Sequence, residues 1–573
     1  MADRDAFIYL RPQLRTTWKT YALLILGLAG AAWFFYGAFI YQFFHGHQVT
    51  GQGTQGAMWG TIVANIVQLI GVSHVGIAIS ATVRILKLKR YQQLARVAEL
   101  VTLVSLTAAV TNIAADVGRP DRFIYNVAMH GNFTGPFVWS CTVITNYLVG
   151  SLVYLYLAMR RDIYLCSRIL PRRRWLYRLL ALGYTDTPEE RENHERVVWW
   201  CAVIILPIMV SVHSVYGWVF GLNAGRPAWF NPFQAPYFVL GAVVTGFSGV
   251  IVVAAIITRV YQWHEIFPDR MFKGLGIFLG FITLLYLYFL FSEVLTGVYS
   301  APEAERAVFN DLLFGRFAPI AWGATVGGMM IPFWILFIQG ANPKICSTRI
   351  VVVGAAPIFF AMWCWRYLIT VPSFFHPHLP YRVMEYQPTF FDWSLVAGSY
   401  FFTLFFYVAL VKILPVLEIP EEFEPEHPVR PPRIPRHRRM TLGVLKRITV
   451  FATVLAGVGL IAYGISTRYD YWTPSPAIWI AGIICLWTIP LQVCMIPGFP
   501  SAARRMRRTT LNTLGLLRPP RNLLPGTMRP SPAWRKRAAY QETEEKRRWR
   551  TKHHPVMSTS SGRRRGRRAG RSG

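Results

Sequence analysis

Five ionisable side chains lie in stretches of the sequence that are otherwise apolar: His74, Asp116, His213, Glu293 and Arg366. A charged group at the centre of a bilayer costs about 2.5–3.5 kcal/mol on insertion scales, so such residues usually have a function. Histidine and carboxylate side chains can accept and release protons. All but His74 are predicted to lie in the outer half of their segments. This grouping is expected for a site that binds a proton-coupled redox ligand and releases protons to one side.

The segments that carry these side chains are long enough to cross a membrane. The 573 residues are 53% apolar and only 15% charged, and the apolar residues gather in blocks of about 20 or more, which span about 30 Å as helices. Backbone groups in lipid must bond within the segment, so we predict an all-α integral membrane protein. The twelve predicted helices are 21–43, 57–86, 97–117, 138–159, 198–220, 235–262, 273–299, 316–340, 349–372, 390–417, 444–466 and 476–497.

The distribution of positive charge predicts the orientation of these helices. Lys and Arg collect in cytoplasmic loops. With the N-terminus inside, only seven of the 60 lie in outer segments. Both termini are therefore predicted to be cytoplasmic, in the inner membrane of a bacterial cell. The net charge of +32 then belongs to one face, where it attracts anionic membrane lipid and indicates no nucleic acid partner.

Cysteine spacing and two polar segments add little chemistry. The seven cysteines form no C-x-x-C pair, so we predict no metal, no haem and no iron–sulfur cluster within the chain. Residues 418–443 are rich in proline and charge and are predicted to be an extended linker. The basic tail, 498–573, is predicted to be disordered or bound to the lipid surface, or else to dock a cytoplasmic partner.

Several motifs, in this order and helix placement, resemble the NrfD/polysulfide-reductase family of membrane subunits, which includes those of alternative complex III. The resemblance covers about 58–415. The motifs are WGTIVANIVQLIGVSHVGIAISA at 59–81, DVGRPDRF at 116–123, GPFVW at 135–139, SVHSVYGWVFG at 211–221, RPAWFNPFQAPYFVLGAVVTGFSG at 226–249, FSEVLTGVYS at 291–300 and WRYLITVPS at 365–373.

The resemblance implies two adjacent four-helix bundles and divides the chain accordingly. The first bundle, which would bind the quinone, is 57–220, and the second is 221–372. A segment with the first helix, 1–56, and a helix in 373–417 would flank them. The linker 418–443, an added two-helix hairpin at 444–497 and the tail 498–573 would follow.

In the family, a quinone or quinol binds in the outer part of the first bundle, beside a ferredoxin-like iron–sulfur subunit on the periplasmic side. The resemblance implies menaquinone or ubiquinone here, with molybdopterin-type or multihaem cytochrome subunits beyond that partner. Asp116 would be the catalytic proton acceptor, with His74 as a second candidate or a step in a proton path. Glu293 and Arg366 would belong to a proton path coupled to translocation. The residues implied to bind the quinone are Asn65, Gln68, Asn112, Arg119, Trp139, Ser140 and His213.

Other interpretations of the same residues remain open. His74 and His213 could be the axial ligands of a haem b. His74, Glu293 and Arg366 could line the path of an ion or solute transporter. Glu293 and Arg366 could also form a structural ion pair, and His213 could bond only to a neighbouring helix.

Overall fold

The computed structural model describes residues 9–14, 16–52, 57–132, 134–170, 173–378, 386–419, 436–467 and 475–495. The predicted basic tail lies outside the described residues, and so does the part of the predicted linker at 420–435. The structure consists of two units, 1–500 and 501–573, and all that follows concerns the first.

The described residues form helices and no strands, which confirms the predicted all-α membrane fold. Eleven helices in the described residues are long and apolar enough to cross a membrane, and α19 has a shorter apolar stretch. These twelve match the predicted segments. Their bounds are Trp18–His45 (α3, a π-helical stretch and α4), α5 Thr61–Ile85, α6 Gln92–Val117, α8 Pro136–Ile169, α10 Pro188–Gly221, α11 Gln234–Tyr261, α12 Asp269–Tyr299, Ala318–Ala341 (α14, a π-helical stretch and α15), α16 Thr348–Thr370, α17 Phe390–Ile413, α18 Arg436–Ser466 and α19 Ser475–Met495.

Four short α-helices were not predicted, one before the first long helix and three between long helices. They are α2 Arg11–Leu14, α7 Pro120–His130, α9 Arg174–Ala181 and α13 Glu303–Phe314. Proline stands at the first position of α7, where its missing N–H costs nothing. In addition, α18 begins at Arg436, inside the predicted linker and earlier than the predicted helix start at 444.

Helix α5 is the centre of the fold, because it contacts α6, α10, α11, α16 and α17. Almost all of it is buried. Two close approaches make this packing possible. A Cβ on Gly76 would overlap the carbonyl oxygen of Ala98, and one on Gly246 of α11 would overlap the Cβ of Val75. Small residues let helix backbones approach closely in membranes.

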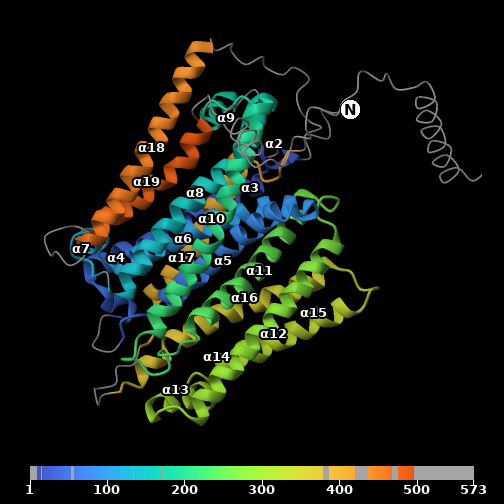
Figure 1. Ribbon diagram of the computed structural model, residues 1–573. Helices are drawn as coiled ribbons and strands as arrows, with labels where there is room; N and C mark the ends of the chain where they lie inside the picture. The colour runs from blue at the N-terminus through green and yellow to red at the C-terminus, as the bar shows by residue number, and fades with distance from the viewer. Residues whose placement is uncertain are drawn as a thin grey trace, which may run out of the picture. The chain divides into compact units, whose positions relative to one another are not determined.

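The other helices are arranged around this centre. Helices α8 and α10 pack together beside α5, while α11, α12, α15 and α16 contact one another in a second group. Helix α17 packs against α3 and α6. Figure 1 shows α18 and α19 side by side along the first group, where α19 contacts α8. There the indole N–H of Trp487 donates to Asn146 at 2.5 Å.

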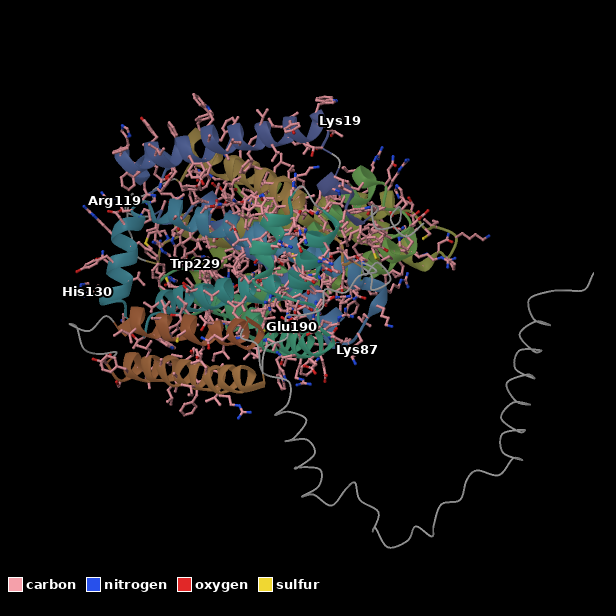
Figure 2. The ribbon with its side chains drawn as sticks, turned by 90° about the horizontal axis from the view of Figure 1, so that it is seen from above. Lys19, Lys87, Arg119, His130, Glu190 and Trp229 are labelled. Carbon is pink, nitrogen blue, oxygen red and sulfur yellow. The ribbon has the colours of Figure 1, made fainter. Side chains whose placement is uncertain are left out.

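The helices define two ends, which we name the outer end and the inner end. Helices α6 and α12 finish at the outer end, and α5 and α11 begin there. Figure 2 shows Arg119 and His130 at the outer end and Lys19 and Lys87 towards the inner end. The names follow the orientation predicted from charge.

Replacing Gly76 by Ala should destabilise the protein by about 1–3 kcal/mol, because the new methyl group would collide with a backbone carbonyl that cannot rotate away. Unfolding in detergent can be followed with a thiol-reactive dye, since Cys166 and Cys201 are buried. The matched control is Gly459→Ala in α18, where a Cβ would meet nothing within 4 Å. Equal unfolding temperatures for both variants would contradict this account of the packing.

Candidate functional site

Asp116 lies on the last turn of α6 at the outer end. Gly118, with a φ of 72°, ends this helix, and the chain then turns into α7. The Oδ1 atom of Asp116 is buried and has no hydrogen-bond partner. Two neighbours interact with it electrostatically, the carboxylate of Asp392 on α17 and the phenol of Tyr216 on α10. Three helices therefore direct ionisable groups to one place.

Asp392 and its partner Tyr386 are polar groups of this site that the sequence analysis missed. Asp392 is fully buried and accepts a short hydrogen bond from the Tyr386 hydroxyl. That hydroxyl also accepts from the backbone N–H of Thr61 at 2.8 Å, at the first residue of α5. In the sequence, Asp392 stands where an acidic residue commonly begins a helix, so its type and position did not distinguish it from an ordinary helix start.

The predicted amides divide between two places. The side-chain nitrogen of Asn65 donates to Asn112 Oδ1 at 3.2 Å and to the Ser399 hydroxyl at 2.8 Å. These residues lie closer to the inner end than Asp116 does, since Asn112 is one helical turn before Asp116 on α6. Gln68 instead donates to the carbonyl of Phe359 on α16 at 3.0 Å. Gln68 therefore bonds towards the second group of helices and not towards Asp116.

The two histidines are in direct contact, although their sequence positions suggested different depths. His74 Nδ1 donates to the Ile70 carbonyl at 2.6 Å, and His74 Nε2 lies 3.2 Å from His213 Nδ1. His213 Nε2 is buried without a partner among the described residues. His74 also stacks on Tyr147 with ring centroids 4.5 Å apart. In this arrangement the two imidazoles are too close together for a haem macrocycle to lie between them.

Three further predicted residues lie near the first residues of α7 and α8. Arg119 is exposed and forms an ion pair with Asp121 at 2.9 Å, and its guanidinium lies 4.9 Å from the ring centroid of Phe43. Ser140 is buried, but its hydroxyl donates to the carbonyl of Phe137 in its own helix. Trp139 is half-buried. Of these, Arg119 alone presents a charge at the surface of the outer end.

Glu293 and Arg366 do not pair with each other. Glu293 accepts a hydrogen bond from Gln234 at 3.1 Å. Arg366 is buried and lies 4.7 Å from the ring centroid of Phe238. Its Nε and Nη1 have no hydrogen-bond partner among the described residues. The structural ion pair that the sequence allowed is therefore not formed.

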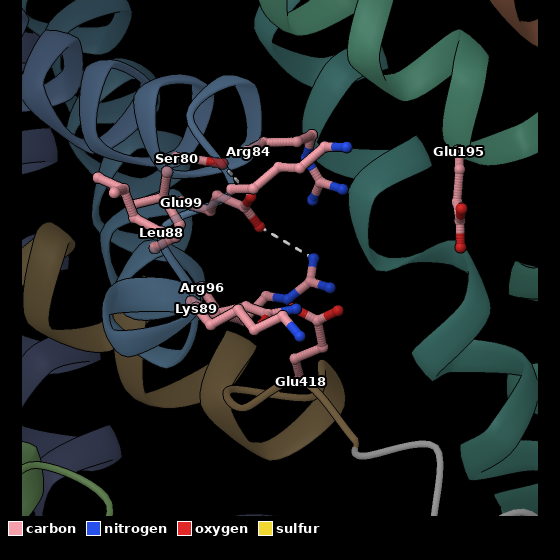
Figure 3. A pocket seen from close by; sticks show the side chains of 12 residues that line it. Ser80, Arg84, Leu88, Lys89, Arg96, Glu99, Glu195 and Glu418 are labelled. Carbon is pink, nitrogen blue, oxygen red and sulfur yellow. Dashed lines mark hydrogen bonds and ion pairs between the residues drawn. The ribbon is translucent and has the colours of Figure 1, made fainter. Parts of the chain in front are cut away.

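A buried ionic network at the inner end was also missed. Arg96 on α6 pairs with Glu99 at 3.0 Å and with Asp162 of α8 at 2.6 Å. The Ser80 hydroxyl donates to Glu99 and lies 2.7 Å from the Tyr154 hydroxyl. Figure 3 shows Ser80, Arg96 and Glu99 of this network in a pocket of about 370 Å³, beside Arg84 and Glu418. Arg96 and Asp162 lie just outside the predicted helices 97–117 and 138–159, where the sequence predicts loops.

The fold and the buried polar groups define a multi-pass helical membrane protein with ionisable groups inside its bundles. The described residues offer no group of three or more His, Cys, Asp or Glu that could hold a metal ion. The profile of the family described as "Polysulphide reductase, NrfD" matches residues 48–378. The chain belongs to this family, as its motifs predict.

Named relatives are subunits of oxidoreductases. The chain is 31% identical to a putative membrane subunit of the dimethyl sulfoxide reductase of Halobacterium salinarum, over 58% of this chain and 71% of the relative. It is 24% identical to a subunit of the selenate reductase of Mesobacillus selenatarsenatis, over 66% and 91%. It is also 24% identical to the Hdr-like menaquinol oxidoreductase integral membrane subunit of Archaeoglobus fulgidus, over 63% and 85%.

Replacing Asp162 by Asn should destabilise the protein by about 3–5 kcal/mol, because it breaks a buried ion pair and leaves Arg96 with only one carboxylate. The two side chains of this pair are 3% and 2% exposed. Asp121→Asn is the matched control, since the pair with Arg119 is 44% and 53% exposed and solvent weakens it. Both variants can be compared by thermal unfolding. An equal loss of stability in the two variants would show that burial of the ion pair does not contribute to its strength.

Proposed function

We propose that this chain is the quinone-binding membrane subunit of a respiratory oxidoreductase complex. Two observations support the proposal. The relatives are named as subunits of reductases, and one as a subunit of a menaquinol oxidoreductase. The outer end also holds a buried carboxylate oxygen without a partner, on Asp116, and this is the observation that carries the proposal.

The groups at the outer end are suited to a quinol. A quinol supplies two electrons and two protons, and its hydroxyl groups are hydrogen-bond donors. Asp116 Oδ1 is an acceptor in need of a donor, and burying it unsatisfied costs about 1–3 kcal/mol or more. Asp116 is therefore proposed to bind the hydroxyl and take its proton. Tyr216 and the buried amides Asn65 and Asn112 would orient the ring.

We propose that the proton leaves Asp116 towards the two histidines in the middle of the first group of helices. His213 lies one turn from Tyr216 on α10, and its Nδ1 lies 3.2 Å from His74 Nε2. The other ring nitrogen of His213, Nε2, has no partner in the described part of the chain. The two histidines are proposed to hold or relay protons.

Electrons would pass to a partner at the outer end. The sequence has no cluster motif of its own, so a ferredoxin-like iron–sulfur subunit is the proposed partner, and molybdopterin-type or multihaem subunits would lie beyond it. The exposed Arg119 and helix α7 offer a docking surface close to Asp116. In this proposal both termini are cytoplasmic, and the outer end faces the periplasm or its equivalent.

Replacing Asp116 by Asn should slow quinol-dependent reduction of the partner by a factor on the order of 10²–10⁴, the usual contribution of a positioned general base. The amide keeps the size of the side chain but cannot accept the proton. Turnover should be measured in the whole complex with saturating quinol, after co-purification has shown that the subunits still assemble.

The control for this experiment is Asp269→Asn, which makes the same chemical change at the exposed start of α12, at the inner end. It should leave turnover unchanged. If Asp116→Asn assembles and turns over like the unmodified complex, Asp116 is not the proton acceptor.

A further inference from the structure

A second pocket lies at the outer end of the second group of helices, away from Asp116. It has a volume of about 290 Å³ between α11 and α12. Its lining includes Phe233, Gln234, Tyr237, Tyr288, Phe289 and Glu293. One part of the wall is therefore aromatic, and the other carries an amide, a phenol and a carboxylate. Pockets for small molecules have this composition, with apolar walls and a few polar groups.

Two buried polar atoms of residues that line this pocket have bonding capacity to spare. Gln234 is 1% exposed and Tyr237 is 3% exposed, yet Gln234 Oε1 forms no hydrogen bond with the described residues, and the Tyr237 hydroxyl has only the hydroxyl of the stacked Tyr286 beside it. The amide nitrogen of Gln234 is held by Glu293, which fixes its oxygen as a free acceptor. Buried polar groups in native proteins are nearly always paired. A bound molecule with hydroxyl or carbonyl groups would supply the missing partners.

The pocket opens towards the lipid and not towards the interior of the bundle. Its rim residues Phe233 and Tyr288 are both 63% exposed, next to and within helices that cross the membrane. The rings of Phe233 and Phe289 have centroids 6.3 Å apart and stand at 65° to each other. A ligand would therefore enter from the bilayer and bring a flat or apolar portion against aromatic rings.

The charge in the pocket selects against an anionic phospholipid headgroup. Glu293 is the one charged residue in the lining, and a carboxylate repels a phosphate. The buried cation of this group of helices, Arg366, lies against Phe238 and Gly241 and is not part of the lining. A neutral ring with hydroxyl or carbonyl groups fits these neighbours better than a phosphate does.

We propose that this pocket is a second binding site for the head group of a membrane quinone or quinol. The ring lies among Phe233, Tyr288 and Phe289, and its oxygens bond to the Tyr237 hydroxyl and Gln234 Oε1. The identity of the ligand rests on the proposed function, whereas the pocket and its buried polar groups do not. Each chain then binds two quinones, one in each group of helices.

The test uses the whole complex in nanodiscs and a photoreactive menaquinone analogue, with cross-linked peptides identified by mass spectrometry. The unmodified protein should be labelled at 233–237 or 288–296, in addition to any labelling near Asp116. Tyr237→Phe removes only the hydroxyl and should reduce labelling of the second pocket about tenfold. Ser292→Trp should block the pocket, whereas Leu295→Trp, at an exposed residue outside the lining, should not.

The results separate this proposal from the proposed function. The proposal of a second quinone site is supported if the second pocket is labelled, and if excess menaquinone removes this labelling while excess phosphatidylglycerol does not. No labelling there in the unmodified protein, or equal competition by the phospholipid, would overturn it, even if the peptides around Asp116 are labelled. If the second pocket is labelled and the peptides around Asp116 are not, the result contradicts the first quinone site and leaves the second in place.

Discussion

The buried ion pairs of Arg96 hold together the inner ends of α6 and α8. Breaking such a pair leaves a charge buried without compensation, so the helices that carry its members are constrained to stay together. Glu99 and Asp162 supply them at 3.0 and 2.6 Å. Asp162 also accepts from the backbone N–H of Ile419, just after α17. One cation thus joins α6, α8 and the chain beyond α17 at the inner end.

Unpaired buried groups occur at both ends of the helices. Among the described residues, Arg84 Nε and His194 Nδ1 have no hydrogen-bond partner at the inner end, and Asp116 Oδ1 and Gln234 Oε1 have none at the outer end. At the outer end the unpaired oxygens lie where the two ligand sites are proposed, and a bound molecule there would pair with them.

Hydropathy and charge were sufficient to predict the membrane helices, because a span needs about 20 apolar residues whatever its neighbours are. They were not sufficient for the contacts between helices. His74 and His213 touch because α5 and α10 cross at a particular rotation, which packing of many side chains decides. Asp392 and Glu99 were missed for a related reason. Each is near a predicted helix end, where an acidic residue is common, and only the neighbouring helices show that it is buried.

The hairpin of α18 and α19 lies beyond the part of the chain that matches the family, 48–378. Helix α19 packs on α7, α8 and α10, and Trp487 fills the space above Gly150, where a Cβ would overlap its ring. The hairpin therefore covers this side of α7, α8 and α10. A lipid-soluble ligand that reaches α8 or α10 from the bilayer would have to approach from another side.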